Sequence, residues 1–356
     1  MRILHVIQEF DVGGAEQLVV TLTRAAAQAG HDVGVAAAPG ALSEELGLDP
    51  YPLPVLKRRR RLVAPAAVRL WRAFKEFRPD VVHAHNPGMA AITAVATLRG
   101  KRPPAFVSVH GVPDNDYAAA VRVLRLAGLP VVACGSGVAA ALEEHGYRPR
   151  ATIPNAVAPA PAPADRGWIQ ATWGIPATEK LIVAVGRLVP VKNHELAISV
   201  LGDVPDAALL IVGDGPLRRE LETLAERGGV GDRVVFAGER FDARELLGAA
   251  DALVMPSHAE GLSLVALEAL SAGTPIVATA VRGSRDLLTD GKTGLLVPPR
   301  DSEALASALR RVLADGQLRA TLAENGRRLA AEHSEDAMVS GFLELSERVA
   351  TRSLDG

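Results

Sequence analysis

Short apolar runs alternate with longer segments in which apolar residues recur every three or four positions along almost the whole chain. Runs of four to eight apolar residues are typical of strands buried on both faces, and the longer period is typical of helices. In the first half, strands are predicted at residues 3–7, 33–37, 81–85, 105–109, 131–134 and 151–153. Helices are predicted between them at 15–29, 66–77, 89–98, 117–126 and 138–145. This order predicts parallel sheets covered by helices.

The alternation is interrupted once, by the Pro- and Ala-rich segment PNAVAPAPAPADR at residues 154–166. Such a segment does not join a sheet, so it favours a stiff linker. Strands resume at 181–185, 208–212, 234–236, 252–255, 275–278 and 294–297, and helices close the chain at 302–314, 317–332 and 336–351. We therefore expect an α/β protein of two Rossmann-like, doubly wound domains, residues 1–160 and 161–335, facing a central cleft. Ligands of such domains bind outside the carboxyl ends of the strands.

The segment SHAEGLSLVALEALSAGTP, residues 257–275, differs from the other predicted helices. Its apolar run predicts a helix buried on all sides, yet Glu268 lies within it, where an unpaired carboxylate costs several kcal/mol. Glu260 precedes Gly261 where the helix is expected to begin, and a glycine there lets a ligand approach the first N–H groups. This combination indicates a phosphate site with an acid on either side. The alternative is structural: Glu260 as favourable charge at a helix N-terminus, and Glu268 paired with an arginine or extended to solvent.

Composition agrees with two folded domains and excludes several classes of protein. The chain has 356 residues, of which 48% are hydrophobic and 22% charged, so there is material for two cores and no case for disorder. A net charge of −2 does not favour nucleic-acid binding. The single cysteine, Cys134, excludes an internal disulfide. We expect a cytoplasmic protein without a signal peptide or membrane span, and its Ala, Arg and Gly content is typical of a GC-rich bacterial source.

Polar residues follow the predicted strands of the first domain. Gly13 and Gly14 open a helix and suit backbone contact with an anion, although a tight turn alone would also explain the pair. His83 and His85 lie on one face of a strand, and hydrogen bonding is favoured over metal binding because no third ligand is evident. His110 directly follows the next strand, which indicates a role at the ligand site more than a structural one.

Two cations follow the first strand of the second domain. Arg187 comes two residues after the strand, and Lys192 precedes a helix start. A planar guanidinium and a compact ammonium suit a diphosphate, whereas the alternative is solvated surface charge. The turns GDG at 213–215 and FAGER at 236–240 follow the next two strands and are candidates to flank a nucleobase.

Together these motifs resemble the nucleotide-sugar-dependent glycosyltransferases of the GT-B fold, specifically the retaining family 4 group. The most specific motif is the E-x7-E element from Glu260 to Glu268. Further motifs over nearly the whole chain are GGAE at 13–16, HAHN at 83–86, HG at 110–111, PNAV at 154–157, GRLVPVKN at 186–193 and DGKTGLLVPP at 290–299. One departure is RGSRD at 282–286, where the family commonly has a glycine pair and a glutamate. This departure leaves open the contacts at the far edge of the donor sugar.

The resemblance implies a role for each candidate residue. Arg187 and Lys192 would hold the donor diphosphate, Glu268 the ribose hydroxyls and Glu260 the hydroxyls of the transferred sugar. His110 would lie beside that sugar, so the catalytic residues are expected to be His110, Arg187, Lys192 and Glu260. Further donor contacts are expected from the backbone at Gly13, Gly14, Gly261, Leu262, Ser263 and Leu264. The resemblance also implies that the helix at 336–356 crosses back to the first domain.

The expected reaction is transfer of a sugar from a nucleoside-diphosphate sugar, UDP being the commonest base, to an acceptor hydroxyl with retention of configuration. A same-face route is preferred because no covalent nucleophile is evident, and the leaving diphosphate would help take the acceptor's proton. Neither a cofactor nor a metal is expected, since the only D-x-D, Asp114 to Asp116, lies in the first domain away from the phosphate site. The alternatives are a sugar phosphorylase or nucleotide-sugar epimerase of the same fold, and a non-catalytic sugar-nucleotide-binding protein.

The acceptor is expected to be a glycan, a lipid-linked molecule or a small hydroxylated molecule. A basic run from Lys57 to Arg61 lies in the first domain. It is either a solvated loop or a peripheral contact with anionic lipid at the inner face of the membrane.

Overall fold

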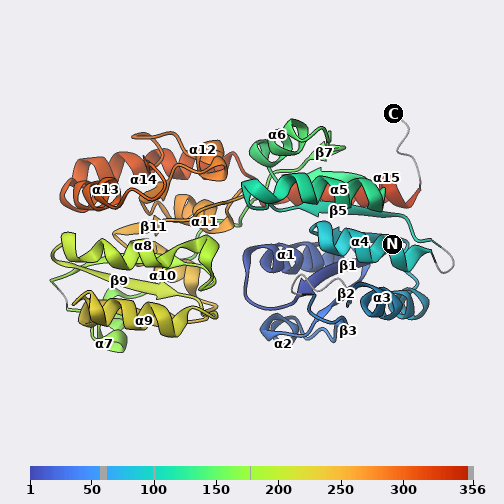
Figure 1. Ribbon diagram of the computed structural model, residues 1–356, viewed down its shortest axis with the longest axis horizontal. Coiled ribbons are helices and arrows are strands. Elements are labelled where there is room, and N and C mark those ends of the chain that lie inside the picture. The colour runs from blue at the N-terminus through green and yellow to red at the C-terminus, as the bar shows by residue number, and fades with distance from the viewer. Residues whose placement is uncertain (57–61, 99–101, 177, 352–356) are drawn as a thin grey trace. The chain divides into compact units, whose positions relative to one another are not determined.

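The computed structural model describes the chain except for residues 57–61, 99–101, 177 and 352–356 (Figure 1). The basic run from Lys57 to Arg61 therefore lies outside the described residues. The chain forms two compact units: unit 1 contains Met1–Asn155 and Glu335–Gly356, and unit 2 contains Ala156–Ser334. The sequence prediction placed these boundaries at residues 160 and 335.

Unit 1 is a parallel sheet with strand order β3-β2-β1-β4-β5-β6-β7. Its strands are β1 (Arg2–Glu9), β2 (Asp32–Ala38), β3 (Tyr51–Pro52), β4 (Val81–His85), β5 (Ala105–Val109), β6 (Val131–Ala133) and β7 (Ala151–Thr152). Its helices are α1 (Gly14–Gln28), α2 (Ala41–Leu46), α3 (Val63–Phe77), α4 (Pro87–Thr97), α5 (Tyr117–Ala127), α6 (Ser136–Glu144) and α15 (Glu335–Ala350). The central strands β4 and β5 are buried throughout, which explains why most of their residues are apolar; the exceptions are His83, His85 and Ser108.

Helix α15 belongs to unit 1 although 179 residues of unit 2 separate it from the rest of that unit. It contacts α1, β4 and β5 (Figure 1, red). Its buried apolar side chains Met338, Phe342, Leu345 and Val349 recur at helical spacing, so one face of α15 covers the sheet.

Unit 2 has strand order β10-β9-β8-β11-β12-β13, the arrangement of a Rossmann sheet. Its strands are β8 (Lys180–Val185), β9 (Ala207–Val212), β10 (Val234–Gly238), β11 (Ala252–Met255), β12 (Ile276–Thr279) and β13 (Leu295–Val297). Its helices are α7 (Arg166–Trp173), α8 (His194–Ser199), α9 (Arg218–Arg227), α10 (Ala243–Ala249), α11 (Leu264–Ala272), α12 (Arg282–Leu287), α13 (Ser302–Ala314) and α14 (Gly316–Ala331). The prediction of two doubly wound parallel-sheet domains is confirmed.

The strand order of unit 2 reverses between β8 and β11, because the chain leaves β8 toward β9 and later returns to β11 on its other side. In open α/β sheets, ligands bind outside the carboxyl ends of the strands at such a reversal. A ligand site is therefore expected in the loops that follow β8 and β11.

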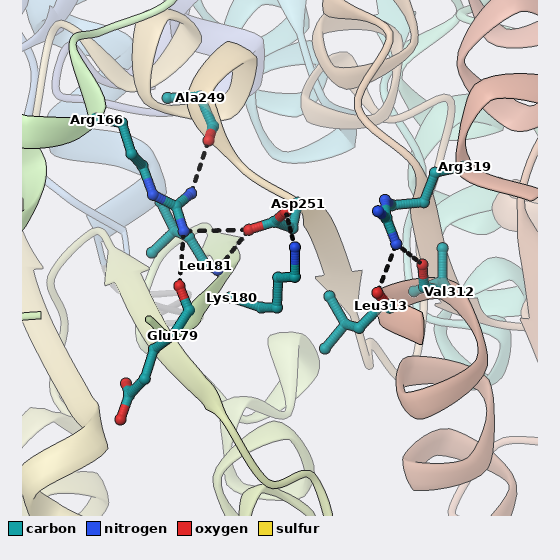
Figure 2. A network of polar contacts seen from close by, with 9 residues as sticks. All are labelled: Arg166, Glu179, Lys180, Leu181, Ala249, Asp251, Val312, Leu313 and Arg319. Carbon is teal, nitrogen blue, oxygen red and sulfur yellow. Dashed lines mark hydrogen bonds and ion pairs between the residues drawn. The ribbon is translucent and has the colours of Figure 1, made fainter. Parts of the chain in front are cut away.

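The opposite, amino end of β8 and β11 is held by a polar network (Figure 2). Arg166 donates hydrogen bonds to the carbonyl oxygens of Glu179 and Ala249, at 3.1 and 2.9 Å, and pairs with Asp251 at 3.1 Å. Asp251 also accepts a hydrogen bond from the backbone N–H of Leu181 at 2.8 Å. This network attaches α7, and hence the Pro/Ala segment before it, to the sheet.

Two other arginines of unit 2 donate hydrogen bonds to backbone carbonyl groups, one at the end of α13 and one in the Pro/Ala segment. Arg319 donates to the carbonyl oxygens of Val312 and Leu313 in the last turn of α13, which helix geometry leaves without partners (Figure 2). Arg244 donates to the carbonyl oxygens of Ala158 and Pro159 at 2.5 and 2.9 Å. The segment that was expected to be a stiff linker is thus hydrogen-bonded to Arg244 of α10 in unit 2.

Candidate active site

A partly buried ion pair lies at the strand reversal of unit 2. Lys192 follows β8, and its Nζ lies 2.7 Å from Oε1 of Glu260, which follows β11. The same oxygen accepts a hydrogen bond from Ser257 Oγ at 2.6 Å, and the Glu260 side chain is only 7% exposed. Because both donors converge on one carboxylate oxygen, the carboxylate is fixed in place while Lys192, 26% exposed, still faces the surface.

Backbone contacts bring the two loops together. The N–H of His258 donates to the carbonyl oxygen of Val191 at 2.8 Å, and Asn193 Nδ2 donates to the carbonyl oxygen of Pro256 at 3.0 Å. Asn193 adopts a left-handed φ of 51°, a conformation that asparagine tolerates better than most residues. The turn at residues 190–193 therefore holds Lys192 against the loop that carries Glu260.

The loop that carries Arg187 packs against the GDG turn, residues 213–215. The backbone of Gly215 lies so close to Leu188 that a Cβ there would be 2.7 Å from the Leu188 carbonyl oxygen. Gly213 approaches the carbonyl oxygen of Gly186 in the same way. The GDG turn thus supports the loop after β8, and the Arg187 side chain is exposed.

Helix α11 begins three residues later than the sequence predicted. Its first residue is Leu264, and Ser263 is the N-cap, whose hydroxyl accepts from the N–H of Ala266 at 3.3 Å. Gly261 consequently lies in the loop and not at the helix entrance. Gly261 instead lies against Gly283 at the start of α12, where a Cβ would overlap the carbonyl oxygens of Glu260 and Gly261. The RGSRD segment therefore packs directly on the Glu260 loop.

Glu268 lies on the half-buried face of α11, because Leu264, Val265 and Glu268 are partly exposed whereas Ala266, Leu267, Ala269 and Leu270 are buried. The expectation of a helix buried on all sides is thus wrong. The Glu268 side chain is 18% exposed, and its Oε1 lies 3.9 Å from Arg244 Nε. Burial raises the pKa of Glu268 to about 7; the charge of Arg244 opposes this rise and that of Glu245 adds to it.

His194, which the sequence analysis did not single out, lies beside the ion pair. A recess about the size of one water molecule is lined by Lys192, His194, Ser257 and Glu260, together with apolar groups of β8 and β11. His194 is 4% exposed, and burial followed by the charge of Lys192 lowers its pKa to about 4. Its imidazole is therefore neutral at neutral pH. The sequence offered one indication that His194 lies at the site, namely that it directly follows Lys192-Asn193.

In unit 1, Gly13 is the N-cap of α1 and Gly14 is its first residue, at the carboxyl end of β1. His110 follows β5, and its Nε2 lies 3.2 Å from His85 Nδ1. His85 in turn contacts His5 of β1, with 3.1 Å between His85 Nε2 and His5 Nδ1. His5 was missed because its proximity depends on the parallel pairing of β1 with β4, which aligns His5 with His83.

His5, His83 and His85 are close enough to be considered as metal ligands, since one ring nitrogen of each lies within 4.8 Å of the others. The third candidate ligand, which was not evident from the sequence, is His5. All three rings are buried and neutral donors, however, so a divalent ion would bring two uncompensated charges into the core. His83 Nε2 is also 2.7 Å from Ser108 Oγ. The donor set fits a hydrogen-bonded cluster better than a metal centre.

Among the sequence-predicted residues, the structure brings Lys192 and Glu260 into direct contact. Arg187, Leu262, Ser263, Leu264 and Glu268 lie on adjoining loops or on α11 of the same unit. Gly13, Gly14 and His110 belong to unit 1. The D-x-D residues form the short helix Asp114–Asp116 after β5, also in unit 1.

Two family models match complementary parts of the chain: "Glycosyltransferase Family 4" over residues 12–160 and "Glycosyl transferases group 1" over residues 165–329. The lipopolysaccharide core biosynthesis glycosyltransferase LpsD of Rhizobium meliloti is 30% identical over 98% of this chain and 98% of its own length. The chain belongs to the glycosyltransferases of the GT-B type. This glycosyltransferase is also 37% identical to LpsE of the same organism, over 48% of this chain and 50% of that protein.

Solved structures agree on the fold of this glycosyltransferase. The Anabaena protein HepE, solved in complex with UDP-glucose, matches with a TM-score of 0.84 at 24% identity over 97% of this chain and 99% of that one. Sucrose-phosphate synthase of Thermosynechococcus elongatus matches with a TM-score of 0.82 at 23% identity over 99% of each chain. Within the described residues, no helix is both long and apolar enough to cross a membrane.

Proposed function

We propose that this glycosyltransferase moves a sugar from a UDP-sugar to a hydroxyl of a glycan acceptor with retention of configuration. The observation that best supports a donor site is the Lys192–Glu260 pair at the strand reversal of unit 2. The names of similar proteins support the substrates: HepE is described in complex with UDP and UDP-glucose, and LpsD and LpsE as lipopolysaccharide core glycosyltransferases.

In this proposal two cations bind the donor diphosphate. Lys192 contributes a compact ammonium charge, and Arg187, at the surface, contributes a planar guanidinium that donates hydrogen bonds. The first turn of α11 has N–H groups that the helix itself does not bond, and they would donate to phosphate oxygens from the same side. These groups would stabilise the charge that develops on the leaving diphosphate, which is the largest contribution available to this site.

Glu260 would accept hydrogen bonds from hydroxyls of the transferred sugar. Glu260 is also paired with Lys192. The diphosphate, bound by Lys192, and the sugar, bound by Glu260, would therefore contact the two members of one ion pair. Glu268, four residues into α11, would accept hydrogen bonds from the two ribose hydroxyls, which a carboxylate can do with its two oxygens. Gly13, Gly14 and His110 of unit 1 would contribute donor contacts of their own.

The bond from the anomeric carbon to the diphosphate oxygen would break while the bond to the acceptor oxygen forms on the same face. The acceptor's proton would pass to the departing phosphate oxygen, so the products are the glycoside and UDP. No metal or cofactor takes part in this route. A lipid-linked glycan at the inner face of the membrane is the proposed acceptor, and the cytoplasm the proposed location.

The first experiment is a thermal-shift screen with UDP, GDP and ADP, because a ligand selective for the folded state raises the melting temperature. We expect the largest rise with UDP. Incubation of UDP-sugars with a lipid-linked glycan should then release UDP only when the acceptor is present, with product of retained configuration by NMR. Donor conversion without acceptor would indicate an epimerase, and binding without turnover a non-catalytic protein.

A further inference from the structure

Helices α3, α4 and α5 form one layer of unit 1, in which α4 packs between the other two (Figure 1). The chain runs from β1 to β3 in one direction along the sheet and from β3 back past β1 to β6 in the other. Because crossovers between parallel strands are right-handed, the helices of the two directions cover opposite sides of the sheet. Helices α1, α2 and α15 contact each other on the opposite side. We call the outer side of α3, α4 and α5 the α3–α5 face.

The outer side of α4 is apolar. The sequence of this helix, PGMAAITAVAT, contains no charged residue. Ala91, Ala94, Val95 and Leu98 recur every three or four positions and are half-buried or exposed, with Val95 39% and Leu98 68% exposed. Leu126, near the end of the neighbouring α5, is 88% exposed. Within the described part of unit 1, every exposed large apolar side chain lies on these two helices, so the exposed apolar surface is concentrated there.

The helices on either side of α4 are basic. Their five cations, all exposed, are Arg69, Arg72, Lys75, Arg122 and Arg125. The same two helices contain one acid, Glu76. Helices α1, α2 and α15 instead contain seven acids and two cations. The two sides of unit 1 thus carry opposite charge, although the net charge of the chain is only −2.

A partner for the α3–α5 face must supply negative charge around an apolar centre. The surface of an anionic bilayer has both, because its headgroups are negative and its acyl chains lie directly beneath them. Arg and Lys side chains can keep their charge among headgroups while their methylene groups cover apolar surface. Trp71 of α3 is half-buried, and Lys75 Nζ lies 4.1 Å from the centre of one of its rings. Tryptophan is enriched at the boundary between headgroups and acyl chains.

A second copy of the chain is a poorer partner. Two copies that met through the α3–α5 face would bring five cations of one against five of the other, and like charges across an interface oppose association.

We propose that the α3–α5 face docks this glycosyltransferase on an anionic lipid bilayer, with its cations among the headgroups and Val95, Leu98 and Leu126 at the acyl boundary. The proposal rests on the proposed function for the purpose of docking, which is to bring the enzyme to a lipid-linked acceptor. The basic run from Lys57 to Arg61 lies outside the described residues, and the α3–α5 face is defined without it.

The first experiment measures how the full chain partitions onto vesicles. We expect binding to phosphatidylcholine vesicles that contain phosphatidylglycerol and little binding to phosphatidylcholine alone. High salt should weaken the binding, because it screens the attraction between the cations and the headgroups.

Paired charge substitutions locate the contact. Each cation close to an anionic surface strengthens partitioning about fivefold, so Arg72→Gln/Arg122→Gln should weaken it about twentyfold. The control, Arg24→Gln/Arg348→Gln, also removes two exposed cations, but from α1 and α15 on the opposite side. It should stay within about threefold of the unsubstituted protein, since these cations face away from the membrane.

The apolar contact has a test of its own. Leu98→Ser/Leu126→Ser should weaken partitioning at least about tenfold, because two leucines no longer leave water. The melting temperature should change little, since both side chains are already exposed in the folded protein.

A fluorescent label shows directly which side enters the membrane. The single native cysteine, Cys134, is buried at 2% exposure, so a thiol-reactive label will attach to an introduced cysteine. A label at Val95→Cys should shift its emission to the blue with anionic vesicles, as expected in apolar surroundings. A label at Gln28→Cys, exposed on α1, should not shift.

Several results would overturn the proposal. One is the absence of vesicle binding by the unsubstituted protein. Another is binding that survives both Arg72→Gln/Arg122→Gln and Leu98→Ser/Leu126→Ser, which would place the contact elsewhere on the chain, the run from Lys57 to Arg61 included. A third is a dimer in light scattering that Leu98→Ser/Leu126→Ser dissociates, in a protein that does not bind vesicles.

Failure of docking and failure of the proposed function can be told apart. The vesicle measurements need neither donor nor acceptor, so vesicle binding without transferase activity would count against the proposed function alone. Transfer to a soluble glycan by a protein that does not bind vesicles would count against docking alone.

Discussion

Replacing Glu268 by glutamine should remove a pH dependence of stability that the burial of its carboxyl creates. The pKa of Glu268 rises from its ordinary 4.5 to about 7 because burial disfavours the charged form. The protonated carboxyl therefore stabilises the folded protein fully below about pH 4.5, and this stabilisation is lost as the pH rises through about 7. Stability should fall between pH 5 and pH 8 in the native protein, and the uncharged amide of the Glu268→Gln variant cannot contribute to that fall.

The size of the effect follows from the shift in pKa. Each pH unit between the ordinary and the raised pKa corresponds to about 1.4 kcal/mol, so the loss between pH 5 and pH 8 approaches about 2.5 kcal/mol. The Glu268 side chain is 18% exposed, which makes this value an upper limit. For a unit of this size, about 2 kcal/mol corresponds to a melting-temperature change of about 4–8 °C.

The assay is differential scanning calorimetry of both proteins at pH 5, 6, 7 and 8. Other titrating groups are common to the two proteins, so the difference between their slopes isolates Glu268. Saturating UDP should reduce that difference, because ribose hydroxyls that donate to the carboxylate stabilise its charged form. Parallel slopes without ligand would refute the burial reasoning, and an unchanged difference with UDP would refute the ribose assignment.

Three further predictions test other parts of unit 2. Lys192→Ala should lower kcat at least a hundredfold with little change in melting temperature, whereas Lys180→Ala, which removes the same charge at the opposite end of β8, should leave steady-state rates near normal. Gly283→Ala should displace the Glu260 loop and abolish most activity, while Gly202→Ala, where a Cβ meets nothing within 4 Å, should be tolerated. Arg166→Ala should lower the free energy of unfolding by about 1–3 kcal/mol in urea titrations without changing KM.

The sequence predicted the fold well because its strands are buried on both faces. The bounds of β4, β5 and β11 agree with the prediction residue for residue, since each is a short, mostly apolar run enclosed by polar or Pro positions. Helix α2 and strand β3 were not predicted, because they have six and two residues and too few positions to establish a period. Apolar runs thus identify the central strands, whereas short or peripheral elements are identified only in part: the two-residue edge strand β7 was predicted, and the ten-residue helix α9 was not.

The sequence predicted which candidate residues follow a strand end. It did not predict which of them contact each other, because those contacts depend on which strands are neighbours in the sheet. Lys192 and Glu260 could each be assigned to a loop at a carboxyl end, but their contact depends on β8 lying beside β11. His5 was overlooked for the same reason, because its contact with His85 depends on the pairing of β1 with β4. The start of α11 was misplaced because Gly261 resembled a helix entrance, whereas its true N-cap is Ser263.

The two ends of the unit 2 sheet differ in the partners of their polar groups. At the amino ends, Arg166 and Asp251 bond to backbone groups and to each other, so the polar groups there satisfy one another. At the carboxyl ends, Glu260 Oε1 accepts hydrogen bonds from Lys192 and Ser257, and under the proposed function a bound diphosphate would lie against this contact. Under the proposed function, the donor diphosphate would join Glu260 as a partner of Lys192, and the existing pair would keep the lysine ordered before the donor binds. A site arranged in this way would favour anionic donors over neutral sugars, because only an anion can pair with the lysine.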